Sequence, residues 1–289
     1  MDVYSEEELF KVIKESYVTS RKIQILGRGH HAKKGEADEF IYTRKMNWYE
    51  IKNDKVIGLA GADVTKIRKE ASELGLLFPT LYDGTLGGLL ATNEPSPLST
   101  TYGKPRDFTT DVRVLTPYGG VKWNFLIGSR GILGAISRAE IKLFPKPQKV
   151  ITYEKASVED YEIKKLIDLS PLVLLVDYDT EKFNVHASFE EDKNVGNNYT
   201  KDEGVPVVEV IDESKEVIVE GDSFSEFENV VKISKPQYAY WVYKSNIFKL
   251  YDADIDSLSK AGIKYYTRDY PKEVYLKLKK LLDYKNIFV

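Results

Sequence analysis

The sequence predicts an α+β protein made of two domains. Amphipathic helical segments and short apolar strands follow one another irregularly, whereas an α/β fold would alternate them strictly. A length of 289 residues also favours two domains over one. The segment Pro145-Lys146-Pro147 is the best candidate for a linker, because closely spaced prolines favour an extended connection. We therefore expect one domain over residues 1–147 and a second over residues 148–289.

Start and stop signals define the elements of the first half. Ser5 and Glu8 form a capping box that predicts a helix start. Asp63 is a candidate N-cap for a second helix, which Gly75 would end in a left-handed conformation. Strands are expected over residues 22–26 and 39–43, and two more over 47–61 that turn at Asn53-Asp54. A hairpin is expected over 107–128 and a further strand over 131–144.

The second half has a different pattern. It predicts a hairpin over 171–189, a polar loop over 190–204, a pair of strands over 205–221, and helices in 256–262 and 271–288. The aromatic run over 236–254 suits a strand with two apolar faces. Such a strand is buried either in the core or by a partner subunit, where Tyr and Trp are also enriched.

Composition excludes several classes of protein. The chain has no cysteine, which excludes disulfides, zinc–thiolate sites and iron–sulfur ligation by this chain. Its 42 basic and 45 acidic residues argue against a nucleic-acid partner, which usually requires a basic surface. We expect no transmembrane segment and no signal peptide, and therefore a cytoplasmic location.

Glycines cluster at two places where a strand ends and the chain must turn. Gly27 and Gly29 flank Arg28, and they allow backbone amides to approach an anion closely. Gly87 and Gly88 open an apolar helical run after Thr85, where the helix dipole also favours an anion. Each loop alone is compatible with an ordinary turn. Together they predict a pyrophosphate-bearing ligand that lies between two segments.

The order of these motifs resembles a known family. The segments "GRGHH", "TLGGLLAT", "YGKPRDFTTDVRVLTPYGG" and "GILGAISRAEIKLFPKP" are similar to the PCMH-type FAD-binding domain of the vanillyl-alcohol oxidase superfamily. Within it, the chain is most similar to the FAD-binding subunits of glycolate oxidase and related 2-hydroxyacid dehydrogenases. The resemblance covers residues 6–147. It implies a two-lobed FAD-binding domain followed by a smaller, reduced α/β cap domain.

The resemblance also implies cofactor contacts at particular positions. The first loop would hold the FAD pyrophosphate, the second would lie beside the pyrophosphate and ring, and the last pair would meet the adenine–ribose side. The implied FAD-binding residues are Gly27, Arg28, Gly29, His30, Thr85, Gly87, Gly88, Tyr102, Gly103, Arg106, Asp107, Gly134 and Ile136. Arg106 is the residue that we expect to place charge near the flavin.

Several family features are missing or altered. His30 lies where some members attach flavin covalently, but the loop reads L-G-R-G-H, so a noncovalent contact is the expectation. The insertion "K-N-x-x-G-Y-D-L" and the histidine-rich motif of the catalytic subunits are absent. His186 is expected to be structural, and a zinc site from His30, His31 and His186 is disfavoured. No catalytic residue is therefore assigned to this chain.

The resulting hypothesis is an FAD-binding subunit of a heteromeric 2-hydroxyacid dehydrogenase complex, glycolate- or D-lactate-like, that holds flavin for electron transfer. Its expected partners are catalytic flavin-containing subunits, with iron–sulfur subunits as further candidates. The first alternative is a structural subunit with lost or vestigial flavin binding. The second is a stand-alone FAD-dependent oxidoreductase. A shared fold cannot rank these hypotheses, because one scaffold supports many functions.

Overall fold

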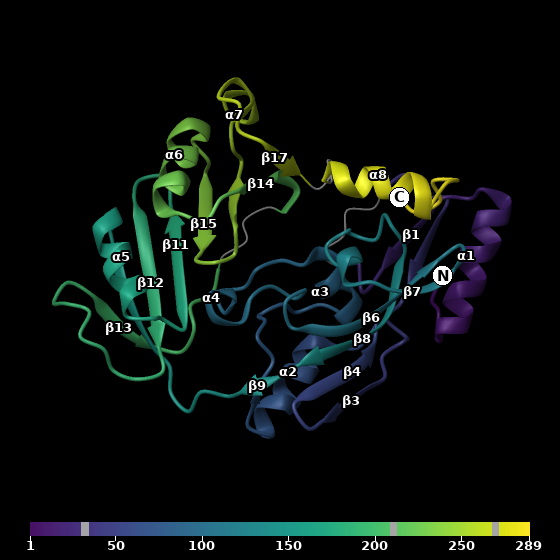
Figure 1. Cartoon of the computed structure of the whole chain (residues 1–289), viewed down its shortest axis with the longest axis horizontal. Coiled ribbons are helices and arrows are strands. Elements are labelled where there is room, and N and C mark those ends of the chain that lie inside the picture. The colour runs from purple at the N-terminus through teal and green to yellow at the C-terminus, as the bar shows by residue number, and fades with distance from the viewer. Residues whose placement is uncertain (30–34, 209–212, 268–271) are drawn as a thin grey trace. The chain divides into compact units, whose positions relative to one another are not determined.

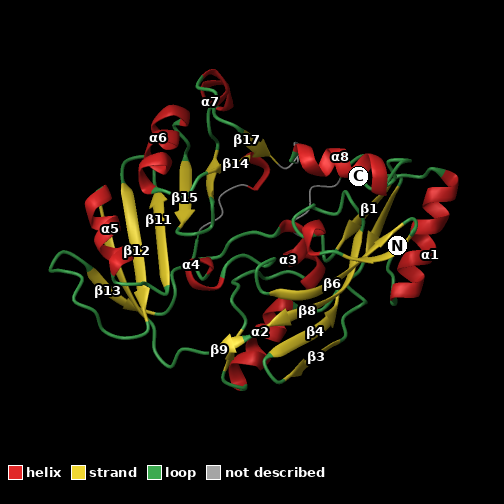
Figure 2. Cartoon of the chain, in the orientation of Figure 1, coloured by secondary structure: helices red, strands yellow, loops and turns green. Residues whose placement is uncertain are grey.

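The computed structural model describes residues 1–29, 35–208, 213–267 and 272–289 (Figure 1). The chain forms two compact units. Unit 1 comprises Met1–Glu94, Lys104–Lys146 and Pro271–Val289, and unit 2 comprises Pro95–Gly103 and Pro147–Tyr270. Helices and strands are mixed in each unit (Figure 2), which confirms the expected α+β class.

Unit 1 is built on a five-stranded antiparallel sheet in the order β3-β4-β8-β6-β7. Its strands are β3 (Tyr49–Lys52), β4 (Lys55–Leu59), β6 (Thr109–Thr116), β7 (Gly119–Lys122) and β8 (Ala135–Lys142). Two small sheets accompany it. One pairs β1 (Ile23–Leu26) in parallel with β2 (Glu39–Tyr42), and the other pairs β5 (Leu76–Leu77) with β9 (Phe144–Pro145).

The helices of unit 1 are α1 (Glu6–Thr19), α2 (Val64–Glu73), α3 (Leu86–Thr92) and α8 (Glu273–Leu282). Two of them, α1 and α2, begin at the caps that the sequence predicts. The Ser5 hydroxyl accepts a hydrogen bond from the Glu8 amide at 3.2 Å, and the Asp63 carboxylate accepts one from the Lys66 amide at 3.1 Å. The Glu8 carboxylate accepts from the amide of Tyr4, one residue before the expected capping-box partner.

The C-terminal residues complete the β1–β2 region of unit 1. The amide of Ile23 donates to the carbonyl of Ile287 at 2.7 Å, and the amide of Val289 donates back to Ile23 at 3.1 Å. The fully buried Asp283 carboxylate accepts from the amides of Ile287 and Phe288, both at 2.9 Å, and from Lys279 at 2.8 Å. Residues 287–289 thus lie beside β1 and form an isolated parallel bridge between Phe288 and Ile23.

Unit 2 is an eight-stranded antiparallel sheet in the order β13-β10-β12-β11-β15-β16-β14-β17. Its strands are β10 (Ile151–Ala156), β11 (Val173–Tyr178), β12 (Phe183–Phe189), β13 (Thr200–Glu203), β14 (Glu216–Glu220), β15 (Tyr238–Val242), β16 (Ile247–Tyr251) and β17 (Tyr265–Thr267). Its helices are α4 (Ser99–Tyr102), α5 (Asp160–Asp168), α6 (Phe224–Ser234) and α7 (Ile255–Lys260). No described helix is long and apolar enough to cross a bilayer.

Helices α5 and α6 lie against the sheet (Figure 1), and their apolar side chains form the core of unit 2 with one of its faces. Leu166 and Phe227 belong to the same buried cluster as Trp241 and Phe248. Every residue of β15 is buried, which confirms the predicted strand with two apolar faces. The opposite face of the sheet also carries polar groups, because Lys249 on β16 pairs with Glu216 at 2.7 Å and both side chains are only 2% exposed.

The structure changes two sequence predictions for unit 2. Of the strand pair expected over 205–221, β14 is present and pairs with β16 and β17, residues 205–208 have no regular structure, and residues 209–212 lie outside the described residues. The expected polar loop over 190–204 contains β13, which pairs with β10 at the edge of the sheet. All four side chains of β13 are exposed, so its sequence lacks the apolar alternation that would indicate a strand.

Candidate functional site

A pocket in unit 1 lies where three glycine-containing segments meet. The segments are the end of β1, the helix α3, and the stretch that leads into β8. The lining residues are Ile25, Leu26, Gly27, Thr43, Ala60, Gly87, Gly88, Ala91, Arg130, Gly131, Gly134, Ala135 and Ile136. Eight of these thirteen are glycine or alanine, so much of the pocket wall is backbone. Such a wall allows a flat or anionic ligand to approach main-chain atoms closely.

The first segment has a glycine, Gly27, at the point where α3 packs against it. A Cβ on Gly27 would overlap the hydroxyl of Thr85, which is the N-cap of α3. The same hydroxyl accepts a hydrogen bond from the amide of Gly88 at 3.2 Å. Residue 27 must therefore be glycine for β1 and α3 to meet at this point of the pocket.

The glycines of α3 have packing reasons as well. A Cβ on Gly87 would lie 2.9 Å from the Cβ of Ala60, and one on Gly88 would lie 2.5 Å from the hydroxyl of Tyr82. The first amides of the helix are also engaged within the protein: those of Leu86 and Gly87 donate to backbone carbonyls at 2.8 Å, and that of Gly88 donates to Thr85. A ligand could therefore approach the backbone at the start of α3 closely, but the first amides of this helix already donate hydrogen bonds within the protein.

The third segment takes an unusual backbone path into β8. Gly128, Gly131 and Gly134 have φ angles of +86°, +85° and +146°, and Arg130 also lies at φ +55°. A Cβ on Gly131 would meet nothing within 4 Å, whereas one on Gly134 would lie 2.8 Å from the carbonyl of Leu115. Gly131 therefore faces open space, and Gly134 is required where β8 joins β6.

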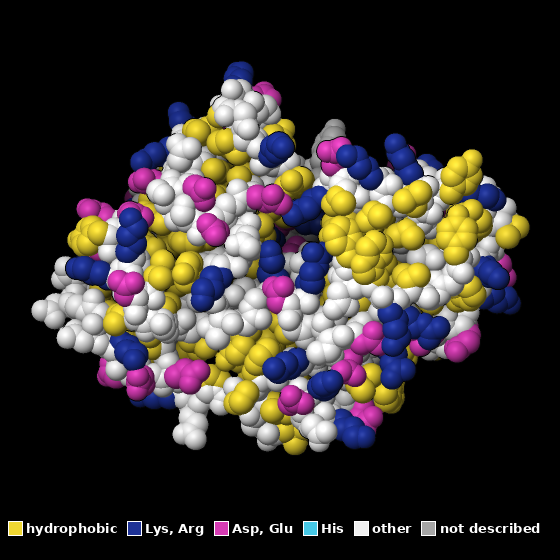
Figure 3. Space-filling view, in the orientation of Figure 1, with side chains coloured by type: hydrophobic (Ala, Val, Ile, Leu, Met, Phe, Trp, Pro, Cys, Tyr) yellow, Lys and Arg dark blue, Asp and Glu magenta, His cyan; other side chains and the backbone are white. Residues whose placement is uncertain are grey.

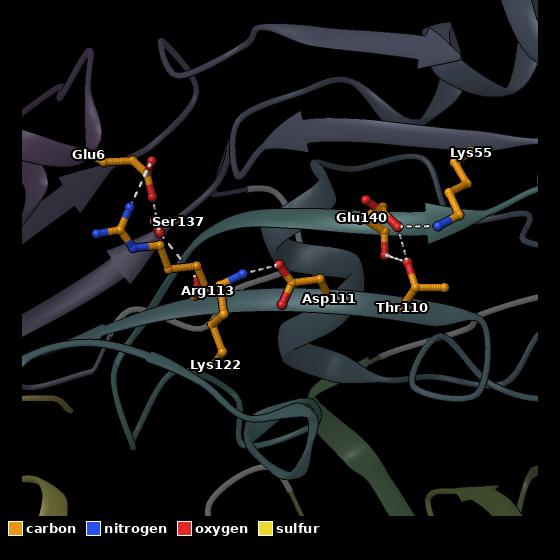
Figure 4. A network of polar contacts seen from close by, with 8 residues as sticks. All are labelled: Glu6, Lys55, Thr110, Asp111, Arg113, Lys122, Ser137 and Glu140. Carbon is orange, nitrogen blue, oxygen red and sulfur yellow. Dashed lines mark hydrogen bonds and ion pairs between the residues drawn. The ribbon is translucent and has the colours of Figure 1, made fainter. Parts of the chain in front are cut away.

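A polar network on the five-stranded sheet holds β8 in place (Figure 4). The buried Ser137 hydroxyl donates to Glu6 of α1 at 2.6 Å, and Arg113 of β6 pairs with the same carboxylate at 3.5 Å. Glu140 accepts from Lys55 at 2.6 Å and from Thr110 at 2.7 Å. These hydrogen bonds lower the pKa of Glu140. The contacts tie β8 to β4, β6 and α1, and so fix the strand that begins at the pocket.

The rest of the first loop is partly described. The Arg28 guanidinium is hydrogen-bonded to the Asp63 carboxylate, so its charge is compensated within the protein. Burial raises the pKa of Asp63, but bonds from the Lys66 amide and from Arg28 outweigh it and hold that pKa below its usual value. Gly29 has φ +82° and lies against Tyr42. His30 lies outside the described residues.

Seven of the described residues that the family resemblance implies do not line this pocket: Arg28, Gly29, Thr85, Tyr102, Gly103, Arg106 and Asp107. Tyr102 and Gly103 end α4 in unit 2, and burial raises the pKa of Tyr102. Arg106 donates to the Tyr275 hydroxyl at 2.8 Å and to the carbonyl of Ile127, so it ties α8 to the stretch before Gly128. Asp107 closes a turn by accepting from the Lys104 amide at 2.7 Å.

The pocket also contains residues that sequence reasoning missed. Two of them, Thr43 and Ala60, lie far from the glycine motifs in sequence. Two others, Ala91 and Arg130, lie close to glycines in sequence but are of a different residue type. The fold brings Thr43 and Ala60 to the pocket, since Ala60 follows β4 and Thr43 follows β2. The positive φ of Arg130 could not be read from the sequence, because Arg rarely adopts that conformation.

His186 has carboxylates at both ring nitrogens. Its Nδ1 lies 2.9 Å from Glu154 and its Nε2 lies 3.5 Å from Asp177. Although burial opposes it, hydrogen bonds to Asp177 and Glu154 raise the pKa of His186. Among the described residues, no group of three His, Asp or Glu side chains is arranged to hold a metal ion.

Comparison with known proteins gives a family-level match. Residues 2–123 match the model of an FAD binding domain. D-lactate dehydrogenases from Anaerostipes hadrus and Archaeoglobus fulgidus are 29% identical over 133 residues and 28% identical over 166 residues. These alignments cover 39% and 49% of this chain, but only 28% and 38% of those relatives. An alkyldihydroxyacetonephosphate synthase from Dictyostelium discoideum is 32% identical over 34% of this chain and 18% of its own length.

Solved structures confirm the fold. Alkyldihydroxyacetonephosphate synthase in two crystal forms matches the whole chain with TM-scores of 0.69 and 0.68 at 16% identity. These matches cover 75% and 76% of the solved chains. The resemblance that the sequence motifs indicate is therefore confirmed at the level of the PCMH-type fold. Eight of the thirteen lining residues of the pocket lie within residues 2–123. Its backbone wall and the one cation among its described lining residues suit the flat, anionic dinucleotide that such a domain binds.

Proposed function

Because residues 2–123 form an FAD-binding domain, we propose that the chain is the FAD-binding subunit of a heteromeric 2-hydroxyacid dehydrogenase complex, glycolate- or D-lactate-like. The observation that carries this proposal is the pocket of unit 1. It joins Gly27, Gly87, Gly88, Gly134 and Ile136, which three separate motifs contribute. The similarity to two D-lactate dehydrogenases supports the substrate class.

The residues of this chain would bind and orient the cofactor. Gly27 and Gly88 would contribute backbone to the pocket wall beside the pyrophosphate, and Ile136 would pack against the adenosine side. The remaining proposed contacts are Arg28, Gly29, His30, Thr85, Gly87, Tyr102, Gly103, Arg106, Asp107 and Gly134. The bound flavin supplies the electron-transfer chemistry, while the protein provides position and electrostatic surroundings. We assign the flavin role to residues 1–147 and the substrate or partner role to residues 148–289.

The surroundings of His186 favour a base supplied by another chain. A general base requires a nitrogen lone pair within reach of the substrate proton. Both ring nitrogens of His186 face carboxylates, and its raised pKa favours the charged form, which has no such lone pair. The proton-accepting group for a hydroxyacid would then belong to a catalytic partner subunit.

An apolar surface of unit 1 supports the existence of a partner. Hydrophobic side chains gather in the region of α8 and the C-terminus (Figure 3). Leu281 on α8 and Tyr284 just after it are 72% and 77% exposed, and Val274 and Leu276 on α8 are also exposed. Contiguous exposed apolar surface commonly marks a protein–protein interface. Co-purification with larger flavin or iron–sulfur chains would separate this proposal from a stand-alone oxidoreductase.

A charge placed in the pocket tests the cofactor site. Ala91 of α3 lines the pocket, and Ala91→Asp would put a carboxylate beside the anionic dinucleotide. We expect FAD affinity to fall by about tenfold or more, the size of a 1.4 kcal/mol loss. Fluorescence titration with FAD measures it, and Ala91→Asn is the matched control because it has nearly the same size without the charge.

Each outcome selects among the hypotheses. Flavin released by acid from the purified chain, with loss of affinity in Ala91→Asp alone, would support the proposal. Flavin that stays with acid-precipitated protein would indicate a covalent bond, for which His30 is the candidate. A folded wild-type chain that takes up no FAD would favour the structural-subunit alternative. Equal affinity in Ala91→Asp and Ala91→Asn would contradict the position of the site.

A further inference from the structure

Arg130 is the one charged residue among the described residues that line the pocket. The sequence motifs draw attention to Arg28 instead, but Arg28 pairs with Asp63 and does not line the pocket. A dinucleotide carries its negative charge on the pyrophosphate, whereas the oxidised flavin ring is neutral. A cation near the phosphates strengthens the binding of such a ligand, and Arg130 is the described lining residue that could supply it.

The backbone at Arg130 is held in a conformation that costs free energy. Arg130 lies at φ +55°, between Gly128 at +86° and Gly131 at +85°. Glycine adopts this region without steric cost, whereas a long side chain is strained there. The strained conformation is fixed by two hydrogen bonds to the end of α3, from the amide of Gly128 to Leu90 at 2.9 Å and from the amide of Arg130 to Ala91 at 2.8 Å. A strained residue at a binding site is a common sign of function.

We propose that Arg130 is a positioning residue that holds the pyrophosphate of the dinucleotide in this pocket. The inference rests on the proposed FAD-binding function and names a contact that the sequence motifs do not indicate. A guanidinium presents a planar set of N–H donors that can bind two phosphate oxygens at once. The glycine and alanine lining would leave room for the phosphates to approach both the backbone and this side chain.

The test compares two probes on matched variants. FAD and ADP share a pyrophosphate, but ADP has no flavin ring. Arg130→Gln removes the charge, and Arg138→Gln is the control because Arg138 is exposed on β8 and does not line the pocket. Calorimetric titration at low ionic strength should show that Arg130→Gln weakens FAD and ADP alike, by about 10- to 100-fold. The affinities of Arg138→Gln for FAD and ADP should stay within about twofold of the wild-type values. Added salt should reduce the difference in affinity between Arg130→Gln and the wild type.

A third variant separates binding from folding. Arg130→Gly relieves the backbone strain, so its melting temperature without ligand should equal or exceed that of the wild type. Its affinity for FAD and ADP should nevertheless fall as in Arg130→Gln. A residue with a merely structural role would not give this combination of higher stability and weaker binding.

The contrary outcomes are distinct. Unchanged affinities in both Arg130 variants would overturn the inference and leave the FAD site intact. Weaker FAD binding with unchanged ADP binding would also overturn it, because the contact would then be to the ring. A folded wild-type chain that binds no FAD would overturn the proposed function and this inference with it.

Discussion

Individual glycines near the pocket serve different purposes that their shared residue type conceals. Gly87 is required by Ala60, and Gly27 by Thr85, so the packing of α3 alone accounts for both. Gly131 has open space around its missing side chain and a positive φ, so a turn is its structural requirement. Sequence alone located all three positions, but only the neighbours supplied by the fold explain why each must be glycine.

The charge state of His186 should make unit 2 less stable at alkaline pH. Its pKa is raised in the folded protein, because the bonds to Asp177 and Glu154 outweigh the effect of burial. The stabilisation is therefore complete below the ordinary histidine pKa of about 6.5 and is lost as the pH rises through the raised folded value. Melting curves at pH 6 and pH 9 should show that His186→Gln removes a shift of a few °C, which corresponds to about 1 kcal/mol.

The carboxylates beside His186 provide a second test of this pH-dependent stabilisation. Glu154 on β10 and Asp177 on β11 are the groups that face it. Glu154→Gln should reduce the same pH-dependent shift without abolishing it, because Asp177 remains. An identical pH dependence in wild type and His186→Gln would mean that other groups are responsible.

At the scale of elements, the helix starts and the turns in the first half could be predicted from the sequence. The edge strands and the pairings between distant segments could not. Ser5 and Asp63 cap their helices as expected, because capping depends on residues within one turn. The helix α5 was missed although Glu159 and Glu162 form a capping box, and so was α6 with Ser223 and Glu226. The capping signals were present at both sites, but Glu is an uncommon N-cap residue at the first.

The pairing of the C-terminal segment with β1 had no local signal. It depends on Asp283, which is buried and accepts from two backbone amides and from Lys279. The sequence showed the helix of this region but not its partner, because long-range strand pairing depends on the whole fold. The pocket has the same limitation, since Thr43 and Ala60 are brought to the glycine motifs only by tertiary structure.

Asp283→Ala should therefore destabilise unit 1 and loosen β1. The substitution leaves the mostly buried Lys279 without its carboxylate partner and removes the acceptor for the last turn of the chain. We expect a loss of about 3 kcal/mol in urea unfolding. Glu273→Ala is the matched control, because Glu273 and Lys277 form an exposed pair with the same spacing on the same helix and such pairs contribute little. Equal effects of the two substitutions would contradict the role of the buried pair.

At the scale of the whole molecule, the chain forms two compact units. A ligand that binds unit 1 should therefore stabilise the segments of unit 1 more than those of unit 2. A ligand stabilises the structure that binds it, by about 2.7 kcal/mol at 100 times its Kd. Hydrogen exchange reports this stabilisation segment by segment, because local opening limits the exchange of each amide. We expect FAD to slow exchange most in residues 86–92 and 128–136, which contribute to the pocket, and in β1.

The strands of unit 2 provide the internal control for that measurement. Residues 173–189 and 238–251 belong to a separate core, so their exchange should change much less on addition of FAD. Protection confined to unit 2 would contradict the proposed site. Protection of both units to the same degree would mean that the units unfold together, and the selective effect of Arg130→Gln on FAD and ADP affinity would then be the remaining measure of where the cofactor binds.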